Sequence, residues 1–218
     1  MAIAFDATTD GSAGAAPVTQ TYAHTCTGTD RILYVSIYTV AVVDTVSGVT
    51  YAGTAMTDVG FASGTWGATT LFRLVNPASG SNNVVISYTG TPIFGVSIAT
   101  SYTGAKQSGG VFVSNTATNE NPTTTITVTL TPNSADNWIV SSNGNQGSEP
   151  FAATNSGFIR NIGSNIAVVH LDTNGGVSGS TTLGMTVSGN GGQALVAESF
   201  EPEADSVSHL LSLLGVGT

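Results

Sequence analysis

Hydrophobic and polar residues alternate along most of the chain, which is the pattern of β-strands with one buried face. In the segment 125–130, for example, Ile126, Val128 and Leu130 alternate with threonines. Because side chains two residues apart lie on the same face of a strand, this spacing predicts half-buried antiparallel strands. The segments 32–37 and 166–171 are mostly apolar and predict central strands that are covered on both faces.

Short runs of Gly, Asn, Asp, Ser and Pro separate these segments, and such runs are typical of turns. Strands that recur every 8–12 residues or so indicate a sandwich, a jelly roll or a barrel. We therefore predict an all-β fold, an antiparallel jelly-roll-like β-sandwich. It should have more than about ten strands and no interior helix longer than two turns, far below the usual helix content.

The strand pattern also occurs twice. Residues 20–36 and 124–141 both consist of an alternating strand, a polar turn with an Asp, and an apolar strand that ends in Val-Ser. Later segments match in the same order, and the two halves close on strands that end in an aromatic residue, Tyr102 in the first half and Phe200 in the second. Such self-similarity predicts two copies of one structural unit.

We predict a single domain over residues 1–203, with similar halves at about 1–105 and 106–203. The halves are expected to face each other as the two sheets of one sandwich, and two small domains are the alternative. One shared core should then contain apolar residues from both halves: Leu33, Val35, Ile37, Ile86, Val96, Ile98, Ile126, Val128, Leu130, Ile139, Val168 and Leu195.

Charged residues make up only 8% of the chain, where roughly 25% is usual. Four Lys and Arg stand against 13 Asp and Glu, and the net charge is −9. A chain without a basic patch repels polyanions, so we expect no nucleic-acid partner. The start of the chain, Met1–Asp6, lacks the basic segment and apolar core of a signal peptide, and no run approaches the ~20 apolar residues of a membrane helix. We expect synthesis without a recognisable signal peptide and no membrane insertion.

Candidate catalytic residues are few. His24 and His170 lie within predicted strands, His209 lies near the C-terminus, and no Gly-x-Ser-x-Gly motif accompanies them. Glu198 and Glu201 are three residues apart on a strand or just after it, so they point to opposite faces and are interpreted as solvated edge charges rather than a glycosidase pair. We therefore expect no enzymatic activity.

Metal and cofactor motifs are equally sparse. The segment 172–176, Asp-Thr-Asn-Gly-Gly, lacks the further carboxylates of a calcium loop and is interpreted as a hairpin turn. The single cysteine, Cys26, excludes an intrachain disulfide and is expected to be buried in a strand. Without a Cys/His cluster there is no zinc motif, and we expect neither a metal nor a cofactor.

Aromatic and polar segments offer one candidate binding residue. Trp66 lies in a Gly-rich turn and is a possible glycan contact, whereas Trp138 lies in an apolar strand and is expected in the core. The polar stretch 141–157 is expected to be a long loop.

The C-terminal segment 204–218 differs from the rest of the chain. Its apolar residues are spaced as on one face of a helix. This helix packs either on its own domain or on a neighbouring subunit, and both alternatives remain open. Its candidate subunit-interface residues are Val207, Leu210, Leu211, Leu213 and Leu214.

Several turns and core strands carry a resemblance to a known family. The segments are Thr27–Leu33, Val49–Thr57, Leu74–Gly80, Val84–Gly90, Ser101–Ala105 and, near the end, Gly184–Gly189 and Ala194–Pro202. Together they resemble a jelly-roll-like β-sandwich domain found in phage particle proteins and bacterial cell-surface proteins. The likeness covers roughly residues 2–202. It implies a fold, and it carries no catalytic residues with it.

The resemblance and the surface-type composition lead to one main functional expectation. The chain is expected to be a non-enzymatic virion structural protein, a capsid decoration protein or an outer head or tail subunit on the virion surface. Its partners would be other copies of itself, in a homo-oligomer, and virion proteins such as a capsid protein. The alternative is a carbohydrate-binding or adhesin module that contacts surface glycans through Trp66.

Overall fold

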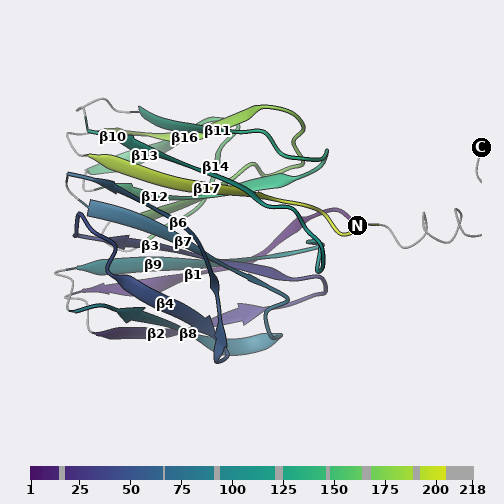
Figure 1. The fold of residues 1–218 in the computed structure, drawn as a ribbon, viewed down its shortest axis with the longest axis horizontal. Helices are drawn as coiled ribbons and strands as arrows, with labels where there is room; N and C mark the ends of the chain where they lie inside the picture. Colours follow the sequence, from purple (N-terminus) through teal and green to yellow (C-terminus); the bar gives the residue numbers. More distant parts are fainter. Residues whose placement is uncertain are drawn as a thin grey trace, which may run out of the picture.

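All regular elements in the described part of the protein are β-strands. The computed structural model describes residues 1–14, 18–65, 67–90, 94–120, 125–145, 148–163, 168–188 and 192–204. Within these ranges the chain forms 17 strands and no helix (Figure 1). The prediction of an all-β, antiparallel sandwich fold with more than ten strands is confirmed.

The first half of the chain forms two antiparallel sheets, which we call sandwich I. Its inner sheet has the strand order β1-β9-β3-β7-β6, and its outer sheet has the order β2-β8-β4-β5. The strands are β1 (Ala4–Gly14), β2 (Thr19–Cys26), β3 (Ile32–Thr39), β4 (Val46–Tyr51), β5 (Thr54–Ala55), β6 (Thr57–Gly64), β7 (Gly67–Val75), β8 (Gly80–Tyr88) and β9 (Gly95–Thr103).

The second half forms two further antiparallel sheets, which we call sandwich II. Its inner sheet has the order β10-β17-β12-β15-β14, and its outer sheet has the order β11-β16-β13. The strands are β10 (Val113–Asn119), β11 (Thr125–Leu130), β12 (Trp138–Asn145), β13 (Ser148–Asn155), β14 (Phe158–Ile162), β15 (Val168–Asp172), β16 (Thr181–Ser188) and β17 (Gln193–Phe200).

The two sandwiches share one topology. If β5 is left aside and the eight remaining strands of each half are counted in order, both inner sheets have the order 1-8-3-6-5 and both outer sheets have the order 2-7-4. A jelly roll pairs its strands as 1-8-3-6 and 2-7-4-5, so each half is a jelly roll whose fifth strand has moved to the inner sheet. The repeated sequence segments 20–36 and 124–141 contain the equivalent strand pairs β2–β3 and β11–β12.

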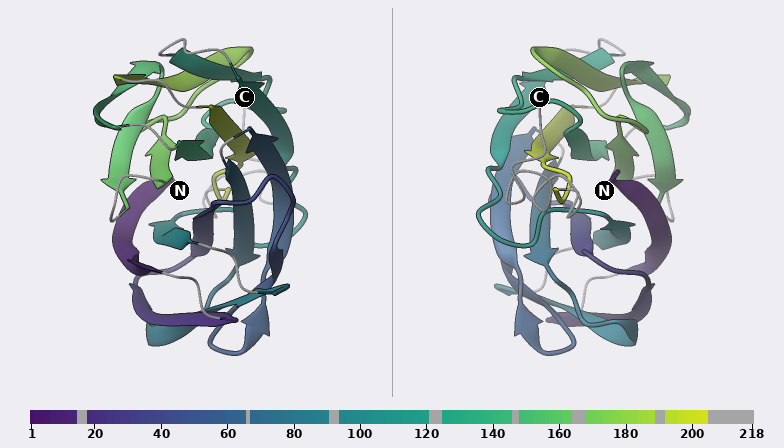
Figure 2. Two further views of the ribbon diagram at one scale, coloured as in Figure 1. Left: turned by 90° about the vertical axis from the view of Figure 1, so that its left-hand side faces the viewer. Right: turned by 90° about the vertical axis from the view of Figure 1, so that its right-hand side faces the viewer.

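The sandwiches stack through their inner sheets, so the molecule has four layers (Figure 1). Figure 2 shows the first half of the chain below and the second half above. The equivalent strands β3 and β12 pack on each other. The contact of β7 with β17 is matched by the contact of β15 with β9, and the contact of β6 with β10 is matched by the contact of β14 with β1. Since equivalent strands exchange places across this contact, the two halves meet as the subunits of a twofold dimer do. The expectation that each half supplies one sheet is wrong, because each half makes both sheets of its own sandwich.

Apolar side chains fill three successive layers of core. All twelve predicted core residues are buried, but they do not form one shared core. Leu33 and Ile86 belong to the cluster within sandwich I, and Ile126 and Leu195 belong to the cluster within sandwich II. Val168 packs with residues of sandwich I between the inner sheets. The reason is geometric, since stacked sheets lie about 10 Å apart and each sheet face contacts only the next layer.

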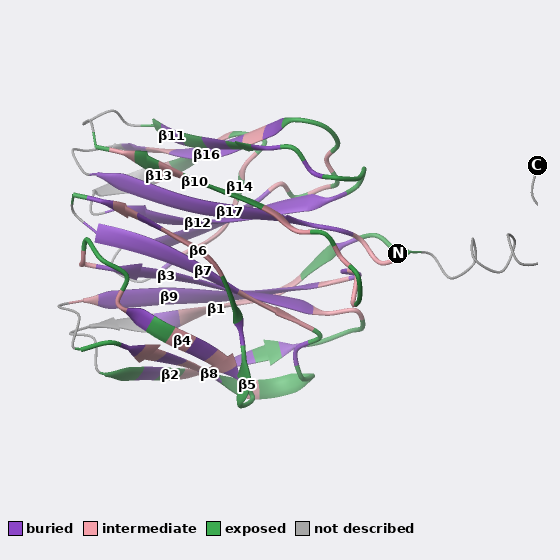
Figure 3. Ribbon diagram, in the orientation of Figure 1, coloured by how far each residue is buried: buried purple, intermediate pink, exposed green. Residues whose placement is uncertain are grey.

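Burial is deepest in the inner sheets (Figure 3). The polar stretch 141–157, expected to be a loop, instead supplies most of β12 and all of β13. Ser141 and Asn143 of β12 are fully buried, and the Asn143 side-chain amide donates to Ser141 Oγ at 2.9 Å and to the Val169 carbonyl at 3.2 Å. The expectation of buried Cys26 at the end of a strand is confirmed.

The contact between the inner sheets predicts that the whole chain unfolds as one unit. Leu71 of β7 is fully buried in the cluster that joins the sandwiches. We expect Leu71→Ala to lower the free energy of unfolding by about 2–5 kcal/mol, because it leaves a cavity there. Differential scanning calorimetry should show one transition, shifted to lower temperature. Two separate transitions, one for each sandwich, would contradict the coupling.

Candidate functional site

A chain of hydrogen bonds joins the two sandwiches inside the molecule. Tyr102 of β9 lies 2.8 Å from Asp172 Oδ2 and 3.0 Å from His170 Nε2, and His170 Nδ1 lies 2.8 Å from Ser36 Oγ. All four residues are fully buried. The Tyr102 hydroxyl has one proton, which it donates to the Asp172 carboxylate, so it accepts from His170 Nε2–H. His170 Nδ1 then accepts the hydroxyl proton of Ser36.

Arg160 of β14 closes this network at the edge of the inner sheet. Its guanidinium contacts the Asp172 carboxylate, donates to Asn174 Oδ1 at 2.5 Å, and lies over the rings of Phe5 and Phe158. Burial, with the charge of Arg160, lowers the pKa of His170 to about 3, so the imidazole is neutral at pH 7. Burial also raises the pKa of Tyr102 well above its usual value.

A second buried network crosses the same contact. Glu198 of β17 is 3% exposed, accepts from Arg73 Nη1 at 2.5 Å and from Tyr34 Oη at 3.0 Å, and Arg73 lies 3.5 Å over the Phe112 ring. Burial raises the pKa of Glu198 although Arg73 opposes the shift. The interpretation of Glu198 as a solvated edge charge is wrong, because β17 is an interior strand of an inner sheet and this side chain faces the other sandwich.

Glu201, the second carboxylate of the supposed pair, is also buried rather than solvated. It is 7% exposed and pairs with Lys106 Nζ at 2.7 Å. It also accepts from the Asn133 side chain. Hydrogen bonds from Lys106 and Asn133 outweigh burial and lower the pKa of Glu201. Glu198 and Glu201 therefore bind different partners and do not form a pair.

His24 sits in a third network, within sandwich I. Its Nδ1 lies 2.9 Å from Thr9 Oγ1 and its Nε2 lies 3.1 Å from Ser101 Oγ, while Ser101 donates to Asp6 Oδ2 at 2.7 Å. Because Ser101 gives its only proton to Asp6, it accepts from His24 Nε2–H. Burial lowers the pKa of His24 to about 4, although Asp6 opposes the shift.

These networks contain the only Ser–His hydrogen bonds in the described part of the chain. In the first, Ser101 donates away from the imidazole, whereas a catalytic serine gives its proton to the histidine. In the second, Ser36 does donate to His170, but both side chains are fully buried between two sheets. The arrangement therefore links sheets together. His209, the remaining histidine, lies outside the described residues.

The segment 172–176 does not form the expected hairpin. It leads from β15 in the inner sheet of sandwich II to β16 in the outer sheet, so it crosses between layers. Asp172 Oδ2 accepts from Tyr102 and contacts Arg160, while Asp172 Oδ1 accepts from the Asn174 backbone amide at 2.8 Å and so holds the start of this connection. Among the described residues, no group of three or more His, Cys, Asp or Glu side chains is placed to hold a metal ion.

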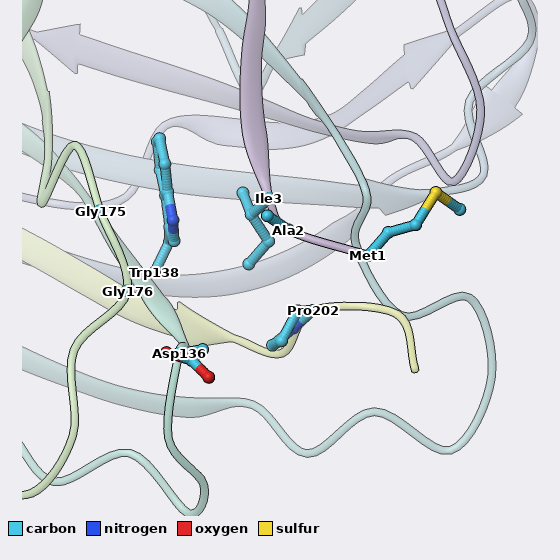
Figure 4. A pocket seen from close by; sticks show the side chains of 8 residues that line it. All are labelled: Met1, Ala2, Ile3, Asp136, Trp138, Gly175, Gly176 and Pro202. Atoms are coloured by element: carbon cyan, nitrogen blue, oxygen red, sulfur yellow. The ribbon is translucent and has the colours of Figure 1, made fainter. Parts of the chain in front are cut away.

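A surface pocket opens at the end of the molecule that carries the N-terminus (Figure 4). We call it the N-terminal pocket. It has a volume of about 460 Å³ and is bounded by Met1, Ile3, Trp138, Pro202, Asp136 and the glycine pair 175–176. Trp138 is 7% exposed, so its predicted place in the core is confirmed, and one side of it also faces the pocket. The size is within the range of small-ligand sites.

Three distant segments meet beside this pocket. The Met1 amine donates to the Glu203 carbonyl at 2.5 Å, and the Glu203 amide donates to the Gly104 carbonyl at 2.7 Å. Ala105 forms an antiparallel bridge with Pro202. The N-terminus and the linker between the sandwiches therefore hold residues 201–203 in place.

A second surface pocket lies on sandwich I. It has a volume of about 540 Å³ and is lined by residues of β4 to β8, among them Val46, Gly48 and Phe72, and by Met56 between β5 and β6. It opens beside β4, near the edge of the outer sheet. In a regular jelly roll the fifth strand would pair with the fourth strand at this edge.

The site residues predicted from the sequence fall outside the described part of the chain. These are Trp66 and the segment residues Val207, Leu210, Leu211, Leu213 and Leu214. Sequence reasoning missed the N-terminal pocket and the buried networks. The one available signal was the presence of Glu198 and His170 within mostly apolar strands.

Comparisons with known proteins give no relative. No family model, no curated protein and no solved structure matches the chain. The resemblance to the phage and cell-surface domain family therefore stays a prediction. No helix in the described ranges is long and apolar enough to span a membrane.

The two buried histidines predict that the protein loses stability in mild acid. Their pKa values of about 3 and about 4 lie below the ordinary 6.5, so the unfolded chain binds more protons between these values. The contribution of the two neutral histidines to the free energy of unfolding is complete above pH 6.5 and is lost as the pH falls. Since two protons are involved, the free energy of unfolding falls by up to about 2.7 kcal/mol per pH unit. Urea unfolding at pH 7.5, 6.5 and 5.5 measures this. His24→Gln should reduce the slope, and a slope equal to that of the unchanged protein would contradict the assignment.

The Arg73–Glu198 pair predicts a strongly non-additive double-mutant cycle. Arg73→Met leaves a buried carboxylate without its cation and should cost about 3–5 kcal/mol, whereas the double variant Arg73→Met/Glu198→Leu should recover most of that loss. The measurement is urea unfolding of the four proteins at pH 7.5. Additive single losses would show that the two side chains do not act as a pair.

Proposed function

We propose that the protein is a non-enzymatic structural subunit of the virion surface, a capsid decoration protein or an outer head or tail component that acts as a homo-oligomer. The observation that carries the proposal is the distribution of charge. Apart from Glu149 in β13, the strands of the two outer sheets contain no Lys, Arg, Asp or Glu, whereas the contact between the sandwiches holds Arg73, Arg160, Asp172 and Glu198. Broad neutral faces of hydroxyl, amide and glycine groups pack against other surfaces without the cost of desolvating charges.

The interior suits a part that has to stay folded outside a cell. All four basic residues are held: Arg73, Lys106 and Arg160 in ion pairs, and Arg31 by the carbonyls of Gly28 and Pro77. Trypsin-type proteases need an extended, accessible Lys or Arg. Few such residues, each fixed by partners, favour long survival in a protease-rich exterior.

The proposed partners are other copies of the chain and a capsid protein. The apolar residues Val207, Leu210, Leu211, Leu213 and Leu214 are the proposed contact. Burying each such side chain contributes roughly 1.5–3 kcal/mol, so the set is sufficient to hold a subunit in place. The net charge of −9 favours protein surfaces over nucleic acid as partners.

A carbohydrate-binding or adhesin role is the second candidate. The N-terminal pocket favours it, since Trp138 and the exposed carboxylate of Asp136 line the same opening. An indole next to a hydrogen-bond acceptor is a common way to hold a sugar. A glycan array with the full chain, Trp66→Ala and Asp136→Asn tests this role, because binding lost in one of the two variants would favour it over the structural one.

Truncation after Ala204 tests the structural role. The full chain should form a homo-oligomer and be found by mass spectrometry in particles from the source culture, whereas residues 1–204 should stay monomeric and fail to bind those particles. The melting temperature should change by less than about 2 °C, because the contacts of Glu203 are kept. Light scattering and a melting curve measure both. A truncated protein that keeps its assembly but loses stability would contradict the proposal.

A further inference from the structure

We propose that the N-terminal pocket receives the segment Val207–Leu214 of a second copy of the chain, so that two copies exchange their C-terminal segments end to end. This inference rests on the proposed homo-oligomeric function and names the receiving surface. Three observations carry it: the lining of the pocket, the position of the pocket beside the last described residues before the segment, and the fixed direction of the chain at Glu203.

The lining of the pocket matches the segment in chemistry. Its walls are largely apolar, with Met1, Ala2, Ile3, Trp138 and Pro202, and Met1 is half exposed at the rim. The segment supplies one valine and four leucines and has no Lys, Arg, Asp or Glu after Asp205. A neutral segment also limits repulsion between two chains that each carry a net charge of −9.

The pocket lies beside the last described residues before the segment. Pro202 is itself part of the pocket wall, and Ala204 is the last described residue. Only Asp205 and Ser206 separate Ala204 from Val207. When two copies meet through this end about a twofold axis, each segment starts next to the partner's pocket and both contacts form at once.

The direction of the chain favours the partner's pocket over its own. Lys106 N donates to the Glu201 carbonyl and Glu203 N donates to the Gly104 carbonyl, so residues 201–203 run extended along the linker. The Met1 amine fixes the Glu203 carbonyl from the other side. Beyond Pro202 the described chain runs away from Trp138 and Asp136 on the pocket wall (Figure 4), so a segment that entered its own pocket would have to turn back after Ala204. The exchange between copies needs no such reversal.

Cysteine cross-linking of the full chain tests the inference. Ala2 is exposed and lines the pocket, so Ala2→Cys/Leu211→Cys treated with a short bis-maleimide should give a covalent dimer on a denaturing gel. The native Cys26 is fully buried and should not react. The matched control is Gly48→Cys/Leu211→Cys, which places the first thiol at the second pocket, where an added Cβ has no atom within 4 Å. The control should give several-fold less dimer.

A pocket-filling variant gives an independent readout. A Cβ at Gly175 would meet only the Thr173 carbonyl oxygen, at 4.0 Å, and the backbone there has no positive φ, so Gly175→Phe should fold and narrow the pocket. Light scattering should show loss of the oligomer for Gly175→Phe and an intact oligomer for Gly48→Phe. Circular dichroism and a melting curve confirm that each variant is folded.

The possible results separate the inference from the proposed function. An intrachain cross-link would overturn the exchange, because it places the segment in its own pocket. Cross-linking no stronger than the control, or an intact Gly175→Phe oligomer, would overturn the pocket as the receiving site. If truncation after Ala204 still abolishes assembly in that case, the proposed function stands and only this inference fails. If truncation leaves assembly intact, the proposed function itself fails.

Discussion

The contact between the two inner sheets is the constraint on which the rest of the structure depends. It buries one face of each five-stranded inner sheet, and the other face packs on the outer sheet of the same sandwich, so every polar group at the contact needs a partner from the opposite sandwich or from its own strands. Tyr102 with Asp172 and His170, and Glu198 with Arg73 and Tyr34, meet that requirement. Because each network takes residues from both halves, separating the halves would break the bonds of Tyr102 to His170 and Asp172 and would part Arg73 from Glu198.

The same contact explains how a repeated sequence gives one body. Two jelly rolls of equal topology expose equal inner sheets, and these sheets pack in a nearly twofold arrangement. Equivalent strands then make equivalent contacts across the axis, but the side chains at these contacts differ between the halves. Glu198 lies in β17 with its partner Arg73 in β7, whereas the contact of β9 with β15 has Tyr102 against His170 and Asp172.

Pairing Arg73 with Glu198 and Arg160 with Asp172 inside leaves the strands of the outer sheets with little charge, while the whole chain keeps a net charge of −9. The outer sheets are rich in threonine, serine, asparagine and glycine, and the N-terminus, the linker and the N-terminal pocket gather at one end. A body with outer sheets of low charge and one chemically distinct end suits a subunit that attaches at that end. This division of roles, with stability in the middle and recognition at the end, is the physical basis of the proposed structural function.

The alternation of residues such as Ile126, Val128 and Leu130 determined the strands, and the repeat determined two equivalent sets of them, because side-chain period is a local property of the backbone. The scarcity of charge also followed from the sequence alone. Only the tertiary structure decided which layer covers each strand face. It buried Ser141 and Asn143, turned Glu198 inward, and brought Met1, Trp138 and Pro202 to one pocket. A local pattern shows that one face of a strand is covered, but it does not show what covers it. Contacting residues can be about 200 positions apart in the chain, as Met1 and Glu203 are. Whether a polar residue can be buried there depends on the hydrogen bonds that such a distant partner offers.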